Sequence, residues 1–310
     1  MRPRTAALTL AVVVIFAASS CASGSRRQPL PPAELEPAPK LKLPLAPEVP
    51  EIPGLLDLHG EVPARYTPGA LDRAANVQER LQVLLLALAS VARRPAPLEL
   101  LVLSPEDWTA GGFSRPYGLP ETRGAAVIAV AAWGDASTVA LAKELLGEPL
   151  PALGGSPLRG TEDEAASLVF SDALVEVEAA RRFLALEGAT WSEPWIGEVL
   201  AHLAARVGFE HGEAGRMPAI ATLFDRAGAR HAGPAAHHLE DWRAGLPLAE
   251  DLWYQALFLR GADLLFVRAG DRGSRRFLVR HLKEGRPFTR GDLEELAPAL
   301  AAWRTSSFAP

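Results

Sequence analysis

Apolar residues recur along this chain in two patterns, an early one typical of strands and a later one typical of helices. The uninterrupted apolar runs at 98–103 and 125–130 predict buried strands, and the alternation over 62–66 predicts a third strand. Apolar positions at helical spacing predict a long helix over 68–94, which Pro95 ends. The later part of the chain is helical throughout, with predicted helices at 137–146, 163–187, 193–208, 216–228, 249–269, 272–284 and 291–303.

The order of these elements predicts the fold class. Strands come first and helices follow, so we expect an α+β fold and no βαβ winding. We place a sheet region at 55–135 and a mainly helical region at 136–310. Together they form one predicted domain over 55–310.

The first twenty residues have the three-part form of a secretory signal. Arg2 and Arg4 precede an apolar run over 6–18, and small residues follow. A bilayer core needs about 20 apolar residues to be crossed, so this run predicts a cleaved signal peptide over 1–20 and not a membrane span.

Cys21 follows this signal and is the only cysteine in 310 residues. The stretch Ala18-Ser19-Ser20-Cys21 resembles the lipobox of bacterial lipoproteins, although Leu is more usual at the position of Ala18. The resemblance implies lipidation of Cys21, with acyl chains such as palmitate, and a membrane anchor in the cell envelope. The residue after the cysteine is Ala22 and not the Asp that signals inner-membrane retention, which favours the outer membrane facing the periplasm. An ordinary signal followed by a chance cysteine stays open as the alternative.

The stretch after the cysteine is rich in proline. Proline favours extended geometry, so residues 21–54 are expected to be a spacer between membrane and domain. The formal charge is −5, and basic residues are mixed with acidic ones without forming a long stripe. Nucleic acid is therefore not an expected partner.

Two neighbouring predicted helices carry the informative chemistry. The first includes Val175-Glu176-Val177-Glu178-Ala179, and the second includes Pro194-Trp195-Ile196-Gly197-Glu198. This pair resembles the core of the gluzincin metallopeptidases, especially the peptidase-MA-like group. In those enzymes one helix carries His-Glu-x-x-His and the next supplies a glutamate as the third zinc ligand.

The resemblance implies a zincin-like domain with Glu176 as the vestigial general base and Glu198 as the vestigial third ligand. Eighteen residues separate Ala179 from Glu198, the spacing typical of that family. Both ligand histidines are missing, because Val175 and Ala179 stand in their places. A catalytic zinc of this type needs two imidazole nitrogens and a carboxylate, so we expect no zinc and no cofactor.

Other interpretations of the same residues stay open. Glu178 with Arg182, and Glu198 with His202, have the i,i+4 spacing of ordinary helix pairs. A carboxylate cluster of Asp172, Glu176 and Glu198 for a hard cation is a further, speculative possibility. Glu178 is left out of that cluster, because i and i+2 positions diverge on a helix.

The sequence therefore predicts a lipid-anchored envelope protein with a metallopeptidase-like pseudoenzyme domain. Its expected role is binding or scaffolding, with a peptide or an envelope protein as ligand. The enzymatic alternative is a divergent metal-dependent peptidase or hydrolase with a non-standard ligand set, for which zinc would be the cofactor. A purely structural role stays open as a third possibility.

Overall fold

The computed structural model describes residues 51–91, 98–124, 126–150, 161–213, 215, 217–230 and 238–306. The predicted signal peptide over 1–20, the lipidation site Cys21 and most of the spacer over 21–54 lie outside these residues. The described residues all belong to one compact unit. Within them, no helix has the length and apolar character needed to cross a membrane.

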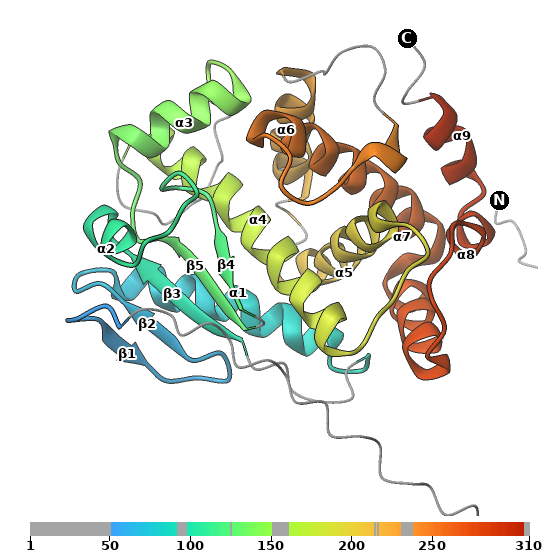
Figure 1. Cartoon of the computed structure of the whole chain (residues 1–310), viewed down its shortest axis with the longest axis horizontal. Helices are drawn as coiled ribbons and strands as arrows, with labels where there is room; N and C mark the ends of the chain where they lie inside the picture. Colours follow the sequence, from blue (N-terminus) through green and yellow to red (C-terminus); the bar gives the residue numbers. More distant parts are fainter. Residues whose placement is uncertain are drawn as a thin grey trace, which may run out of the picture. The chain divides into compact units, whose positions relative to one another are not determined.

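A five-stranded mixed sheet forms the N-terminal part of the domain (Figure 1). Its order is β1-β2-β3-β5-β4; β2, β3 and β5 run parallel, and both edge strands pair antiparallel. The strands are β1 (Leu56–Leu58), β2 (Ala64–Tyr66), β3 (Glu99–Leu103), β4 (Glu121–Arg123) and β5 (Val127–Ala131).

The expectation that the sheet lacks βαβ winding is wrong. Helix α1 (Leu71–Leu88) joins the parallel strands β2 and β3, and the short helix α2 (Pro105–Ala110) lies between β3 and β5. Parallel strands are covered on both faces and read as continuous apolar runs, which is how β3 and β5 are composed. The α1 helix is also shorter than the predicted 68–94.

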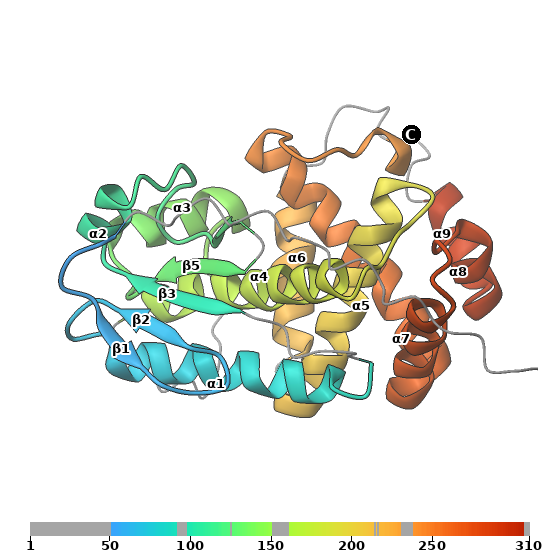
Figure 2. The ribbon, with the colours of Figure 1, turned by 60° about the horizontal axis from the view of Figure 1, so that its bottom comes forward.

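Helices cover the two faces of the sheet unequally. Leu100 and Ile128 belong to the large core that also contains α1 and α4 (Glu162–Leu186), while Leu101 packs with Trp108 and Phe113 in a small separate core. Helix α4 extends from the sheet into the helical part (Figure 2). The sheet and the helices therefore share one core, with α4 running through it.

The helical region follows the predicted order, and the α+β fold class is confirmed. The long helix α7 (Leu248–Glu284) is interrupted at Gly270 (φ 65°), between the two helices predicted at 249–269 and 272–284. Left-handed backbone of this kind is readily adopted only by glycine. The other helices of this region are α3 (Ala136–Leu146), α5 (Pro194–Glu213), α6 (Met217–Arg230), α8 (Arg290–Leu296) and α9 (Ala299–Ser306).

Candidate functional site

A pocket of about 240 Å³ opens between α4, the N-terminal turns of α5 and the start of α7. We call it the α4–α5 pocket. Helix α4 supplies Glu178 and Arg181, and α5 supplies Glu198 from its second turn. The segment before α7 adds Trp242, and the first turns of α7 add leucine side chains to the wall. The pocket thus combines buried charges with apolar surface.

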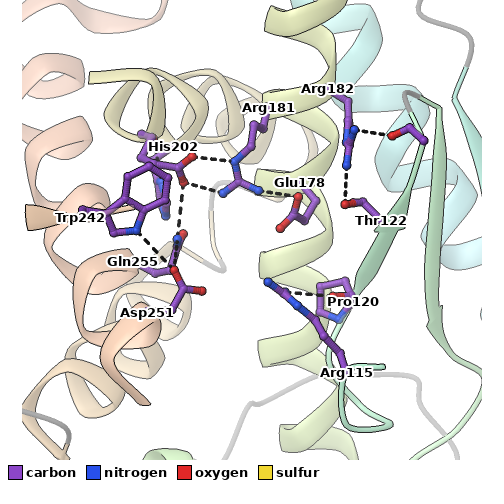
Figure 3. Close-up of polar contacts among 12 residues, drawn as sticks. Arg115, Pro120, Thr122, Glu178, Arg181, Arg182, His202, Trp242, Asp251 and Gln255 are labelled. Atoms are coloured by element: carbon purple, nitrogen blue, oxygen red, sulfur yellow. Dashed lines mark hydrogen bonds and ion pairs between the residues drawn. The ribbon is translucent and has the colours of Figure 1, made fainter. Parts of the chain in front are cut away.

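Arg181 occupies the centre of this pocket and holds two carboxylates (Figure 3). Its Nε and Nη2 donate to the two oxygens of Glu198 at 2.8 and 2.6 Å, and its Nη1 forms an ion pair with Glu178. The fork geometry toward Glu198 is the strong, bidentate form of this interaction. We call Arg181 with Glu178 and Glu198 the Arg181 bridge.

The bridge shifts the pKa values of Arg181 and Glu178 toward their charged forms. Burial by itself would lower the pKa of Arg181, but Glu178 and Glu198 outweigh it and raise the pKa. Burial would likewise raise the pKa of Glu178, yet Arg181 holds that pKa below its ordinary value. A carboxylate that is ionised and already paired has little tendency to take up a proton near neutral pH.

The α7 side of the pocket presents hydrogen-bonding groups. Gln255, which is 5% exposed, donates through Nε2 to Asp251 at 3.3 Å and to Glu198 at 3.5 Å. The indole Nε1 of Trp242 donates to the same Asp251 at 3.4 Å. The Oε1 atom of Gln255 is buried and has no hydrogen-bond partner among the described residues. This wall therefore contains a buried acceptor without a partner among the described residues, close to the Asp251 carboxylate.

The opposite wall is cationic. Arg182 donates to the carbonyl of Gly124 and to the hydroxyl of Thr122, which joins α4 to strand β4. Arg115 is exposed on the loop after α2 and donates to the carbonyl of Pro120 at 3.1 Å. Figure 3 shows Arg115 across the pocket from Asp251. The two walls thus carry opposite charge.

Of the predicted site residues that the structure describes, Glu198 alone lies in this pocket. Glu176 is buried on another side of α4, where it lines a separate pocket of about 120 Å³ with Arg80 of α1 and Gly208 of α5. The expected convergence of Glu176 and Glu198 is not found. Positions i and i+2 point about 200° apart on a helix, so Glu178 faces Glu198 in its place.

Asp172 is committed to a structural role. It is 1% exposed and forms ion pairs with Arg73 at 2.5 Å and with Arg80, both from α1. Because two guanidinium groups hold this carboxylate, it does not join a cation site with Glu176 and Glu198. Across the described part of the chain, no group of three His, Cys, Asp or Glu residues could hold a metal ion.

Neither of the two i,i+4 pairs that the helical spacing suggests, Glu178 with Arg182 and Glu198 with His202, forms between the side chains as expected. Glu178 pairs with Arg181 at i,i+3, whereas Arg182 turns toward β4. His202 donates from Nδ1 to the backbone carbonyl of Glu198 at 3.0 Å, not to its carboxylate. Its Nε2 has no partner among the described residues, and burial lowers the pKa of His202 to about 3.

The sequence patterns do not predict Arg181, the central residue of the pocket. Helix α4 is buried on nearly all sides, so apolar periodicity does not say which of its faces meets α5. A usable signal was the charge pattern, in which Glu178 and Arg181 are i,i+3 partners and a second carboxylate follows at Glu198. Trp242 and Asp251 lie too far along the chain for local spacing to link them to α4.

Comparison with known proteins adds no assignment: no family model, curated protein or solved structure matches this chain.

Proposed function

We propose that this chain is an envelope lipoprotein whose folded domain binds a ligand in the α4–α5 pocket and does not catalyse a reaction there. The observation that carries the proposal is the Arg181 bridge. A hydrolytic site of the metallopeptidase kind needs a metal-held water and a free carboxylate base. In this pocket a guanidinium takes the place between the two carboxylates and leaves neither of them unpaired.

The proposal keeps the gluzincin-like interpretation in an altered form. A glutamate near the start of the second helix still faces the preceding helix, as the resemblance implies for Glu198. The carboxylate opposite it is Glu178, and Arg181 stands where a bound cation would be expected. Such a domain is a metallopeptidase-like pseudoenzyme in which a side-chain cation has replaced zinc.

The walls of the pocket suit a peptide ligand or a segment of an envelope protein. Arg115 and Arg182 can donate to carbonyl or carboxylate oxygens, and the carboxylate of Asp251 can accept from an amide. Leu119, Leu174 and Leu252 line the same space and can cover apolar side chains. A few placed polar groups on an apolar lining are typical of ligand pockets.

Metal analysis with a cleavage assay tests the non-enzymatic proposal. The purified chain is incubated with zinc, freed of excess metal, and assayed for bound zinc and for casein hydrolysis. We expect less than stoichiometric zinc and no hydrolysis. One bound zinc per chain with hydrolysis, both lost in Glu198→Gln, would replace the proposal with the metal-dependent hydrolase. Asp225→Asn, an exposed carboxylate change, is the matched control.

Acyl labelling tests the anchor. Cells expressing the chain are labelled with palmitate, and we expect label on the wild-type protein and none on Cys21→Ala. Label that persists in the variant, or a wild-type protein released without label, would remove the lipoprotein part of the proposal. The binding domain would stand independently of that result.

A further inference from the structure

The second segment of α7 presents a row of basic side chains to solvent. It begins after the break at Gly270 and ends at Gly285, whose φ of 64° closes the helix. Arg272, Arg276, Arg280 and Lys283 are all exposed, and we call these four the α7 basic face. At 100° per residue they lie within about 80° of one another, over a length of about 16 Å.

The other side of this segment is buried. Ser274, Leu278 and His281 point into the domain, which fixes the basic face outward. Figures 1 and 2 both place the segment on the side of the domain away from the sheet. The face is therefore open to a partner that approaches this end of the domain.

The acidic residues of the segment do not neutralise this face. Asp271 pairs with Arg275 at 2.5 Å, and Glu284 pairs with Arg286 at 2.7 Å while reaching Arg280 at 3.5 Å. Within the described part of the chain, Arg272, Arg276 and Lys283 have no carboxylate partner. Uncompensated positive charge is thus concentrated on three of the four positions.

Neighbouring groups extend the positive surface on one side and limit it on another. Arg268 lines a pocket together with Arg280, and exposed Val267 precedes it on the first segment of α7. Asp292 and Glu295 of α8 line the same pocket, and Asp292 is already paired with Arg286. The positive charge is therefore strongest around Arg272 and Arg276.

The net charge of this segment differs strongly from that of the whole chain. Residues 268–290 contain eight Lys and Arg against two Asp and Glu, whereas the whole chain has a net charge of −5. The basic positions are interleaved with apolar and small ones, which is why no stripe is visible in the linear sequence. Helical spacing gathers them on one side.

We propose that the α7 basic face docks on anionic phospholipid headgroups of the membrane that holds the chain. Guanidinium groups bind phosphate through paired N–H donors, and basic helix surfaces are drawn to anionic bilayers. The inference rests on the proposed envelope anchor, which would keep the domain at high local concentration beside the headgroups, where a weak site suffices. The face lacks exposed aromatic rings for stacking bases, which favours lipid over nucleic acid.

Vesicle sedimentation tests this surface without help from the anchor. Residues 21–310 carrying Cys21→Ser are mixed with vesicles of phosphatidylethanolamine and phosphatidylglycerol at about 7:3, or with phosphatidylcholine alone. We expect binding to the anionic vesicles only, weakening about tenfold or more as salt rises from about 50 to about 300 mM. Arg276→Glu should weaken it about tenfold, and Arg272→Glu with Arg276→Glu further.

The matched control is Arg243→Glu, the same charge change at an exposed arginine outside α7. Equal binding to both vesicle types would overturn the proposal, as would equal losses in Arg276→Glu and Arg243→Glu. Tighter binding of a single-stranded oligonucleotide than of the anionic vesicles at the same salt would replace lipid by nucleic acid. If the chain does not bind anionic vesicles while palmitate labelling still shows acylated Cys21, the α7 basic face is ruled out as a lipid-binding surface. The proposals for the lipid anchor and for the α4–α5 pocket would not be affected.

Discussion

The two sides of helix α4 carry buried ion-pair clusters of opposite composition. On one side a single carboxylate, Asp172, holds two arginines from α1. On the other a single arginine, Arg181, holds two carboxylates and lines a pocket. In the first cluster Asp172 is 1% exposed and its partners Arg73 and Arg80 are 5% and 11% exposed, whereas Arg181 of the second cluster is 25% exposed. The same chemistry thus serves packing on one side of α4 and lines a more solvent-accessible surface on the other.

The largest expected loss of stability is on the side of α4 that holds Asp172. Asp172→Asn leaves Arg73 and Arg80 without their shared counter-ion, and removal of one partner of a buried pair costs about 3–5 kcal/mol. Urea unfolding measures the loss. The control is Asp225→Asn, which breaks an exposed pair with Arg260 and should cost less than about 1 kcal/mol. Similar losses in the two variants would contradict the stabilising role of the buried Asp172 ion pairs.

A smaller effect is expected on the pocket side, and it depends on pH. Arg181→Met leaves two carboxylates without a cation, and we expect a loss of about 2–3 kcal/mol at neutral pH because water can reach the pocket. In the wild type the lowered pKa of Glu178 gives stability above the ordinary value of 4.5 that is lost as pH falls. Without Arg181 burial raises that pKa, so acid relieves the penalty.

The difference in unfolding free energy between Arg181→Met and wild type should therefore narrow between pH 7 and pH 4. Urea titrations at a series of pH values measure it. Asp172→Asn serves as the comparison, because its unpaired groups are arginines that stay charged over this range. A gap for Arg181→Met that stays constant with pH would show that the two carboxylates are not what the arginine stabilises.

The next largest expected effect is the pH dependence of stability that comes from His202, one turn after Glu198. Its pKa is lowered to about 3, so it stays neutral in the folded chain while the unfolded chain takes up a proton near pH 6.5. Stability contributed by the neutral ring is present above pH 6.5 and is lost as pH falls toward 3, by about 2 kcal/mol at pH 5. His202→Gln should flatten that slope in urea titrations. His59→Gln, at an exposed position, should leave the slope unchanged.

The smallest expected effect distinguishes two buried glutamines. Gln78 donates to the carbonyls of Val62 and Leu58 at 2.8 and 3.3 Å, so Gln78→Met leaves them unsatisfied and should cost about 1–2 kcal/mol. Gln255 makes only long contacts and has an unused acceptor, so Gln255→Met should cost less than about 1 kcal/mol. Thermal and urea unfolding compare them. A larger loss for Gln255 would indicate a packing role and not a ligand contact.

Sequence patterning predicted the main elements but not the whole sheet. The apolar runs of β3 and β5 and the helical periods from α3 onward were visible, because each is long enough to show its repeat. The edge strands β1 and β4 have three residues each and no alternation to detect. The parallel pairing of β2 with β3 depends on where α1 packs, which local spacing does not encode.

Only part of the site can be predicted, because spacing along a helix does not show which of its faces meets a neighbouring helix. The sequence predicts Glu198 from its position on the second helix, but it places the partner carboxylate at Glu176, two residues from Glu178, which faces Glu198 in the structure. Helix α4 is buried on nearly every side, so its sequence alone does not show that Glu178 and Arg181 are the residues that face α5. The α7 basic face was hidden by the same interleaving, because its members are separated by three or four positions.

The Arg181 bridge has a consequence for how the pocket responds to its surroundings. A metal ion can be stripped by a chelator or exchanged for a competing ion, whereas a guanidinium attached to the backbone cannot leave. The charge between Glu178 and Glu198 is therefore present in every folded molecule, whatever the mineral content of the medium. Ligand affinity in the pocket should accordingly be indifferent to chelators.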